Sequence, residues 1–464
     1  MSSHAIDDAP VTPFHWRLVL ATAGGPFVDG YLLGVVAIGL PIMGHQIHIS
    51  TLWLSLIGAA SLIGIFFGGL IFGPLTDLVG RNLMYRLNLL SFAILSILQF
   101  FVGDPVQLFI VRLLLGVMIG ADYPIATVMA SELIPRRLRG PALAGLSFAW
   151  AIGNTAAVAV SAVLGSFGDG SWRWIFASGV VPTVIVFALR LGIPESPRWL
   201  AARGRVAEAR AIVLDKLGSN VDVDGFLAGA AEIPTGAKRK VSVAELVRRG
   251  YLRPLVFCSV FWMAQIAPSY ALRTYQPELL DRFGVTNTHL GTMVVSVFPI
   301  IGAGAGIWLV NRLGRRPTLI WSFVGMTAAL TVLGIVPAAS GVLAILMFMA
   351  FNLAEGTGST LEYLYPNELF PTDLRATGVG FAVAASRIGS AASTFAFPLL
   401  LADAGGSIGV LLAGGICAVG LLTAVRMAPE TRHLTLDESS KPPVRRGASD
   451  RLDQPTRQPE PEIR

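Results

Sequence analysis

The feature that most limits what this chain can fold into is a series of apolar runs, each close to the roughly 20 residues with which an α-helix crosses a membrane. Hydrophobic residues make up 53% of the 464 residues and charged residues only 14%. A soluble domain carries about 25% charged residues, so this chain lacks the charge to cover a surface in water. The sequence therefore predicts an all-α membrane protein with twelve transmembrane helices. The runs are Trp16–Ile42, Leu52–Leu75, Met84–Val102, Val106–Ala130, Pro141–Gly165, Trp174–Gly192, Leu252–Leu279, His289–Val310, Pro317–Val336, Val342–Tyr365, Ala376–Leu400 and Ile408–Met427.

Lysine and arginine fall into alternate connections between these runs, and the other connections carry almost none beyond Arg173 and Arg282. Because basic residues collect in cytoplasmic loops, both termini and the central loop are predicted to be cytoplasmic and the chain to lie in a cell membrane. The same bias accounts for the net charge of +6 without nucleic acid as a partner. The basic connections contain Arg81; Arg136, Arg137 and Arg139; Lys238, Arg239 and Lys240; Arg312, Arg315 and Arg316; and Arg375.

Composition divides the chain further. An amphipathic stretch, Arg198–Leu217, predicts short surface helices, and the polar, Pro-rich tail after Asp437 predicts disorder. Met1–Phe14 lacks the features of a cleaved signal peptide, so the first helix is expected to be retained. Cys258 and Cys417 lie inside apolar runs and indicate neither a disulfide nor a metal site. The predicted parts are an N-terminus (1–15), a six-helix bundle (16–193), a central loop (194–250), a second six-helix bundle (251–428) and a tail (429–464).

Three short motifs occur once in each half of the chain, and the two copies lie 234 to 236 residues apart each time. This near-constant spacing predicts two pseudo-symmetric bundles of the same topology, with a substrate site between them and rocking-type alternating access. Since one chain supplies both halves of the site, a monomer is expected. The pairs are Gly73–Arg81 with Asn311–Arg316, Ser131–Gly140 with Asn367–Arg375, and Pro194–Pro197 with Pro429–Thr431.

The repeated motifs place acids and arginines at the predicted cytoplasmic edge, where ion pairs can open and close as the halves rock. Glu132 with Arg139 and Glu368 with Arg375 are the predicted latches. The alternative is static ion pairs that only orient the loops. The predicted gating residues are Asp77, Arg81, Glu132, Arg139, Arg315, Glu368 and Arg375.

These motifs resemble the major facilitator superfamily over essentially the whole chain except the tail. Pro194–Leu200, Tyr365–Thr372 and Pro429–Thr431 are similar to signatures of its sugar porters and metabolite:proton symporters. The resemblance implies a secondary transporter of a small polar metabolite, with protons as the coupling ion.

Other positions depart from a sugar carrier. The seventh helix of sugar porters typically carries a glutamine pair, whereas Met263–Tyr270 keeps Gln265 only. Gly120–Pro124 is similar to a motif of phosphate:proton symporters, and Ser386–Gly389 to one of organic-ion carriers. The cargo is therefore expected to be a sugar or an organic anion.

Ionisable residues inside spanning segments are costly and mark functional sites. Asp29 lies roughly 20 Å along the first helix and Arg112 roughly 10 Å down the fourth, which brings them to the same level of a core about 30 Å thick. The resemblance implies that they pair and that proton binding to Asp29 releases Arg112. A permanent structural salt bridge is the alternative. Asp122 is predicted to relay protons or to recognise a substrate hydroxyl.

Arg387 and Glu355 lie at roughly 17 and 20 Å along their helices, so they are expected to pair near the midplane until a substrate anion binds Arg387. The alternative is a pair that only joins two helices. Gln265, Asn154 and Tyr363 are candidate hydrogen-bonding groups for the solute. Arg273, near the outer end of its helix, is expected to extend to the membrane interface.

Other functions have less support. Gly302–Gly306 sits in an apolar helix without a preceding strand, so it predicts close helix packing rather than nucleotide binding. No Walker lysine, metal motif or nucleophile elbow occurs in the sequence, so neither an enzyme nor a cofactor or metal is predicted. A proton-coupled exporter remains an alternative, and a transporter-like nutrient sensor is a weaker one.

Overall fold

A computed structural model describes residues 11–79, 81–217, 223, 243–336, 341–371, 374–432 and 439–440. The regular elements within these ranges are all helices. They are α1 (Pro13–Gly34), α2 (Val36–Gln46), α3 (Thr51–Val79), α4 (Arg81–Phe100), α5 (Pro105–Leu133), α6 (Arg136–Gly165), α7 (Ser171–Ala177), α8 (Val180–Arg190), α9 (Pro197–Ala202), α10 (Val206–Leu217), α12 (Val243–Arg248), α13 (Leu252–Thr274), α14 (Gln276–Arg282), α15 (Thr288–Ser296), α16 (Phe298–Arg312), α17 (Arg315–Ile335), α18 (Gly341–Leu369), α19 (Arg375–Ala404) and α20 (Gly406–Met427).

Each of the predicted apolar runs coincides with one long helix or with two successive helices. Eleven of them are long and apolar enough to cross a membrane. The remaining run lies in α19, which carries Arg387 and several buried serine and threonine side chains among its apolar residues. Polar side chains of this kind turn inward in a bundle because lipid cannot solvate them. Lys238, Arg239, Lys240 and most of the Pro-rich tail lie outside the described residues.

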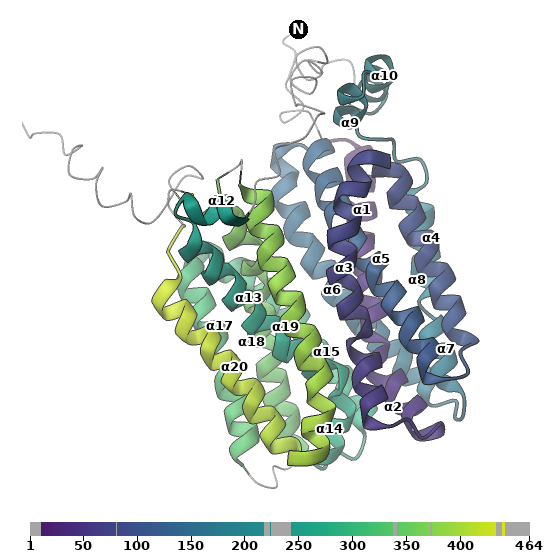
Figure 1. Ribbon diagram of the computed structural model, residues 1–464, viewed down its shortest axis with the longest axis vertical. Helices are drawn as coiled ribbons and strands as arrows, with labels where there is room; N and C mark the ends of the chain where they lie inside the picture. The colour runs from purple at the N-terminus through teal and green to yellow at the C-terminus, as the bar shows by residue number, and fades with distance from the viewer. Residues whose placement is uncertain are drawn as a thin grey trace, which may run out of the picture.

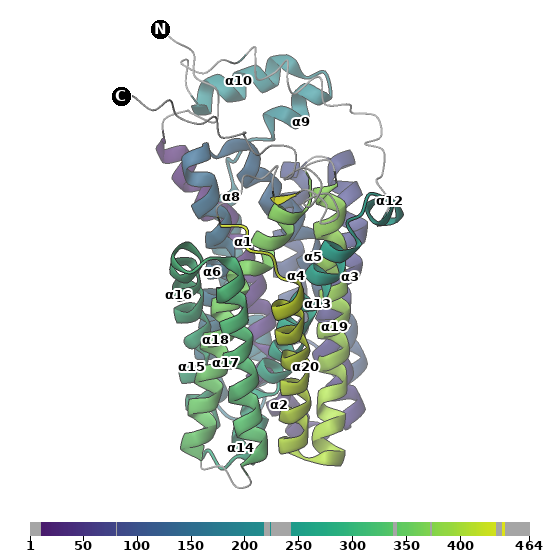
Figure 2. The same ribbon diagram turned by 90° about the vertical axis from the view of Figure 1, so that its left-hand side faces the viewer.

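The chain forms two bundles side by side (Figure 1). Helices α1–α8 build one half and α13–α20 the other, and the halves contact each other through α3 with α19 and through α6 with α15 and α16. Figure 2 shows α9, α10 and α12 at one end of the molecule and α2 and α14 toward the other. We name these the α9–α10 end and the α2–α14 end. The short helices α9 and α10 occupy the stretch predicted to form surface helices.

Close backbone contacts hold helices together within each half. In α3 and α5, a Cβ atom on Gly68 would lie 2.0 Å from the Val117 carbonyl oxygen, and one on Gly116 would lie 2.1 Å from that of Ser61. In the second half, a Cβ atom on Gly302 of α16 would lie 2.3 Å from the carbonyl oxygen of Leu353 on α18. Small residues allow such approach in membrane bundles. A Cβ atom on Gly306 would lie 2.4 Å from the Thr357 carbonyl oxygen, whereas one on Gly304 would meet no atom of the described residues within 4 Å. The predicted close helix packing is therefore confirmed at Gly302 and Gly306.

The first helix of each half is interrupted near the α2–α14 end. The break between α1 and α2 falls at Val35, and that between α13 and α14 falls at Tyr275. The Tyr275 hydroxyl donates a hydrogen bond of 3.1 Å to the carbonyl oxygen of Leu54 on α3, which joins the halves there. Interrupted helices at matching positions of two repeats commonly line the binding site of a secondary transporter.

Candidate transport site and gates

The first half contains a buried ion pair between α5 and α8. Arg190 Nη1 lies 3.0 Å from Asp122 Oδ1, and both side chains are fully buried. Asp122 also accepts hydrogen bonds from Arg190 Nη2 at 3.3 Å and from Asn88 Nδ2 at 3.0 Å. The guanidinium carbon of Arg190 lies 3.3 Å from the centre of the Tyr85 ring, close enough for a cation–π contact. Side chains from α4 and α8 thus hold Asp122, and its part in proton relay or in recognition of a substrate hydroxyl stays a prediction.

Glycine at position 25 of α1 makes room for this pair. A Cβ atom there would lie 1.9 Å from Asp122 Oδ2 and 2.4 Å from Arg190 Nη2. The backbone of α1 therefore packs directly against the two charged groups. Arg190 Nε also donates a hydrogen bond of 3.4 Å to the Ala21 carbonyl oxygen of α1.

The predicted contact between Asp29 and Arg112 is absent from the structure. Among the described residues, neither carboxylate oxygen of Asp29 has a hydrogen-bond partner, although the side chain is fully buried. Arg112 instead donates to Gln99 Oε1 at 3.3 Å and to the Leu32 carbonyl oxygen at 3.4 Å. Depth along a helix placed the two residues at one level, but depth does not fix the direction in which each side chain points.

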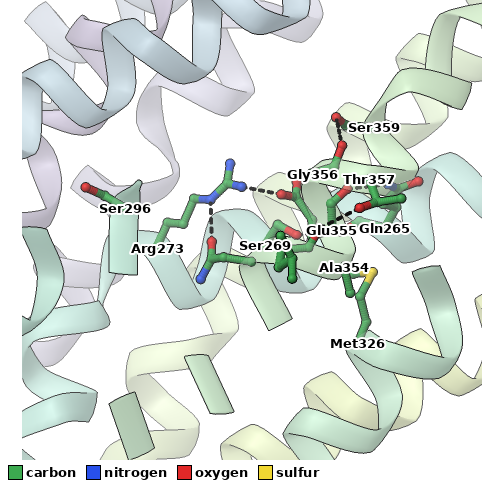
Figure 3. A network of polar contacts seen from close by, with 12 residues as sticks. Gln265, Ser269, Arg273, Ser296, Met326, Ala354, Glu355, Gly356, Thr357 and Ser359 are labelled. Atoms are coloured by element: carbon green, nitrogen blue, oxygen red, sulfur yellow. Dashed lines mark hydrogen bonds and ion pairs between the residues drawn. The ribbon is translucent and has the colours of Figure 1, made fainter. Parts of the chain in front are cut away.

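The predicted pair of Arg387 with Glu355 is also not formed. Glu355 on α18 pairs with Arg273 of α13, which was expected to extend to the membrane interface (Figure 3). The Arg273 side chain is only 14% exposed. It also donates to Asn352 Oδ1 at 3.4 Å and lies over the Trp150 ring, 5.5 Å from its centre. The ion pair with the buried Glu355 carboxylate keeps Arg273 inside the bundle.

Arg387 on α19 donates to the Tyr270 hydroxyl at 3.2 Å. Tyr270 in turn packs edge-on against Trp150 of the first half, with ring centres 6.1 Å apart. Arg387 therefore lies close to the interface between the halves, as its proposed role in substrate binding requires.

Two of the predicted hydrogen-bonding residues join helices in this state. Gln265 Nε2 donates to the Glu355 carbonyl oxygen at 3.1 Å, and its side chain is fully buried (Figure 3). Asn154 Nδ2 donates to the Gly30 carbonyl oxygen at 3.4 Å and faces a cavity between the halves. The side chain of Tyr363 lies outside the described part of the structure.

The cavity between the halves has a volume of about 30 Å³. A water molecule needs about 10–15 Å³ on this measure, so there is room for about two waters and none for a sugar. Solute binding therefore requires side chains or whole helices to move. The residues around the cavity that carry polar or aromatic groups include Trp150, Asn154, Tyr270, Arg273, Ser296 and Asn352.

At the α9–α10 end, the repeated motifs of the second half meet one another. The Glu430 carboxylate accepts hydrogen bonds from the backbone N–H groups of Arg315 at 3.0 Å and Arg316 at 3.1 Å, at the start of α17. Gly314 adopts a φ of +100°, and a Cβ atom there would lie 2.6 Å from Glu430 Oε2. Glycine therefore meets both the backbone and the space requirement at this turn.

The predicted ion pair between Glu368 and Arg375 is wrong, because Glu368 pairs with a different arginine. Glu368 pairs with Arg315 at 2.9 Å and accepts a hydrogen bond from the Thr431 hydroxyl. Arg375 Nε donates to the Phe370 carbonyl oxygen at 3.2 Å. The ion pair of Glu368 thus joins α17 to α18 within one half.

The first half repeats this arrangement as far as it is described. Glu195 accepts hydrogen bonds from the Asn82 backbone N–H at 3.2 and 3.0 Å, at the start of α4. The side chains of the other predicted gating residues, Asp77, Arg81, Glu132 and Arg139, lie outside the described part of the structure.

Sequence reasoning missed Arg190 and the two capping glutamates and rejected Arg273. Arg190 lies near the end of its apolar run, at the last residue of α8, where a basic residue is easily taken for an anchor at the membrane edge. Glu195 and Glu430 belong to a motif that occurs once in each half, and so do the residues at the starts of α4 and α17. A carboxylate and a helix start that are both repeated at the same spacing are the signal that predicts a cap.

Comparison with known proteins agrees with this architecture. The family described as "Sugar (and other) transporter" matches residues 18–441. The putative metabolite transport protein YaaU of Escherichia coli (strain K12) is 35% identical over 446 residues, covering 96% of this chain and 98% of that protein. The inner membrane metabolite transport protein YgcS of the same strain is 34% identical over 431 residues, covering 93% and 95%.

Among solved structures, the partially occluded inward open conformation of the xylose transporter XylE from E. coli superposes with a TM-score of 0.77 at 20% identity, covering 91% of this chain and 100% of that chain. XylE bound to 6-bromo-6-deoxy-D-glucose gives a TM-score of 0.74 at 21% identity, covering 92% and 98%. This likeness confirms the predicted major facilitator fold.

Proposed function

The chain belongs to the sugar (and other) transporter family and carries small metabolites, and we propose that it is a proton-coupled symporter of a sugar or an organic anion. In this proposal it works as a monomer in the cell membrane by alternating access, with the α9–α10 end in the cytoplasm. The solved structure of XylE, named a proton:xylose symporter, supports the coupling ion.

The observation that carries the proton coupling is the Asp29 carboxyl group, which is buried without a hydrogen bond. An ionised carboxylate in such a place costs several kcal/mol, whereas the protonated acid is tolerated. Arg190 and, from the other half, Arg387 lie within electrostatic range of Asp29. Loss of the proton therefore creates a charge that attracts a cation across the interface, and binding of the proton removes it.

Arg112 is the partner that we propose for Asp29 in another state of the cycle. In the present state Arg112 is held by two neutral acceptors, Gln99 and the Leu32 carbonyl. A carboxylate is a stronger partner for a buried guanidinium than either of these acceptors. Deprotonation of Asp29 thus favours a rearrangement of α1 against α5, and the membrane potential contributes about 2.3 kcal/mol per proton per 100 mV.

The cluster of Arg315, Glu368 and Glu430 is the proposed gate at the α9–α10 end of the second half. Its members tie the start of α17 to the end of α18. In the proposed cycle this cluster holds the ends of α17 and α18 together while the halves rock. The further gating residues that we propose at the cytoplasmic edge are Asp77, Arg81, Glu132, Arg139 and Arg375.

Uptake into proteoliposomes under an inward proton gradient tests the proposal. The labelled panel contains hexoses, pentoses, small carboxylates, aromatic acids and phosphate. We expect at least one solute to accumulate above its external concentration, and a protonophore to abolish the accumulation. Accumulation that is indifferent to the proton gradient would refute proton coupling, and accumulation driven only by an outward gradient would favour the exporter.

A further inference from the structure

Arg273 is the charged residue among the described residues that line the central cavity. Arg273 lines the cavity, whereas its partner Glu355 is not among the described residues around it. In the view of Figure 3, Arg273 lies between Glu355 and Ser296, a residue that also lines the cavity. Contacts with Asn352 and with the Trp150 ring hold the guanidinium in place. A fixed planar guanidinium is the donor that proteins most often use to bind carboxylates.

The group bound to Arg273 in this state is itself a carboxylate, with its side chain only 6% exposed. A solute carboxylate that enters from the cavity offers Arg273 the same hydrogen bonds, so it can replace Glu355 without leaving the guanidinium unpaired. A neutral sugar cannot, because separating a buried ion pair leaves both charges uncompensated. The dianion of phosphate brings more negative charge than Glu355 withdraws. The exchange therefore fits a group with one negative charge.

Once the substrate carboxylate has displaced it, Glu355 is a buried carboxylate that has lost its ion pair with Arg273. Among the described residues, the other ionisable groups that interact with it are Glu362 on the same helix and the Cys417 thiol on α20, while Arg387 of α19 interacts with Glu362. Two buried carboxyl groups this close disfavour being ionised at the same time. Binding of a proton removes this cost, so displacement and proton uptake occur together.

We propose that the substrate is a small organic monocarboxylate that takes the place of Glu355 on Arg273, and that Glu355 binds a proton when it is displaced. This inference rests on the proposed transport function and adds to it a substrate class and a second proton site, separate from Asp29. The proton comes from the solution on the side from which the substrate enters. It leaves when Glu355 returns to Arg273 and the substrate departs.

Calorimetric titration of the detergent-solubilised full chain tests this exchange, with sodium benzoate and sodium lactate as probes and D-xylose and phosphate as comparators. Measurement in two buffers with different enthalpies of ionisation gives the number of protons bound with each solute. We expect a carboxylate to bind to the wild-type protein with about one more proton than to Glu355→Gln. Glu355→Asp, which keeps an acid, retains the wild-type proton count and serves as the second variant if Glu355→Gln folds poorly.

Substitution of the arginine tests the other partner. Arg273→Gln is expected to weaken carboxylate binding about 10- to 100-fold, and Arg273→Lys to weaken it less. Arg282→Gln is the matched control, since Arg282 forms an exposed ion pair with Glu278 at the α2–α14 end and should leave affinity unchanged.

The outcomes separate the two proposals. Proton-driven uptake of D-xylose without binding of either carboxylate would overturn the substrate class and leave proton-coupled symport intact. Equal proton counts for wild type and Glu355→Gln would overturn the role of Glu355. If a carboxylate binds with the expected proton but none of the panel is driven by a proton gradient, the exchange at Arg273 stands and the proposed function fails.

Discussion

Glu195 and Glu430 perform the same task in the two halves of the molecule. Each carboxylate accepts backbone N–H groups at the start of a helix, α4 in one half and α17 in the other. Each also accepts a hydrogen bond from the N–H of the residue that follows it, Ser196 or Thr431. The internal repeat of the sequence is thus repeated in the helix caps, although Glu195 accepts from the N–H of Asn82 and Glu430 from those of Arg315 and Arg316.

Removal of either cap should destabilise the protein by a similar amount. A carboxylate that satisfies free N–H groups at a helix start contributes about 1–2 kcal/mol. We expect Glu195→Ala and Glu430→Ala each to lower the apparent melting temperature in detergent. Glu208→Ala is the control, because Glu208 forms an exposed ion pair with Arg205 and its removal should leave the melting temperature unchanged. A large effect from one cap alone would show that the halves are not equivalent.

Replacing one member of the buried pair of Asp122 and Arg190 should destabilise the protein more than replacing both. Loss of one partner leaves a buried charge, at a cost of about 3–5 kcal/mol. Asp122→Asn and Arg190→Met should therefore each lower the melting temperature strongly, and the double variant should recover part of the loss. A double-mutant cycle on thermal unfolding measures the coupling; simple additivity would mean that the two groups do not depend on each other.

Neutralising Asp29 should have the opposite effect on stability from neutralising Asp122. Asp29→Asn removes a buried carboxylate that has no hydrogen bond, so the melting temperature should stay the same or rise. The same variant should lose proton-driven accumulation while retaining exchange of labelled for unlabelled solute, which needs no net proton movement. Retained accumulation against a gradient would exclude Asp29 as the coupling group.

A larger side chain at position 58 should open the α2–α14 end. A Cβ atom on Gly58 would lie 2.2 Å from the Tyr275 hydroxyl, the group that joins the halves there. In Gly58→Leu we expect faster alkylation of a cysteine introduced at Ala37, a buried residue of the cavity wall, by a membrane-impermeant maleimide. Cys258 and Cys417 are buried and should contribute little background. Equal labelling rates with and without the leucine would contradict this role of Gly58.

The helices were predictable because the length and composition of an apolar run are local properties of the chain. The glycines of Gly302–Gly306 likewise indicated their packing, since only small residues permit backbone contact between membrane helices.

The ion pairs were less predictable, because they depend on which helices are neighbours and on how each helix is rotated. The rise per residue of a helix gave the depth of Asp29 and Arg112. In the structure, however, Arg112 donates to Gln99, and the Asp29 carboxylate has no hydrogen-bond partner among the described residues. Arg273 was assigned to the membrane interface from its position near a helix end. The adjacent α14 and the Glu355 carboxylate, both consequences of tertiary structure, keep it buried.

The contact between α3 and α5 at Gly68 and Gly116 has a mechanical consequence. With no side chains between them, the two backbones have no soft layer in which one could slide over the other. Helix α3 bears Gly58, against which Tyr275 of the opposite half rests, and α5 bears Arg112 and Asp122. A tilt of α3 at that contact must therefore move α5 with it. Separation of the halves at Gly58 then displaces Arg112, whose backbone carbonyl oxygen accepts a hydrogen bond of 3.0 Å from Ser61 of α3, and also Asp122, about three helical turns further along α5.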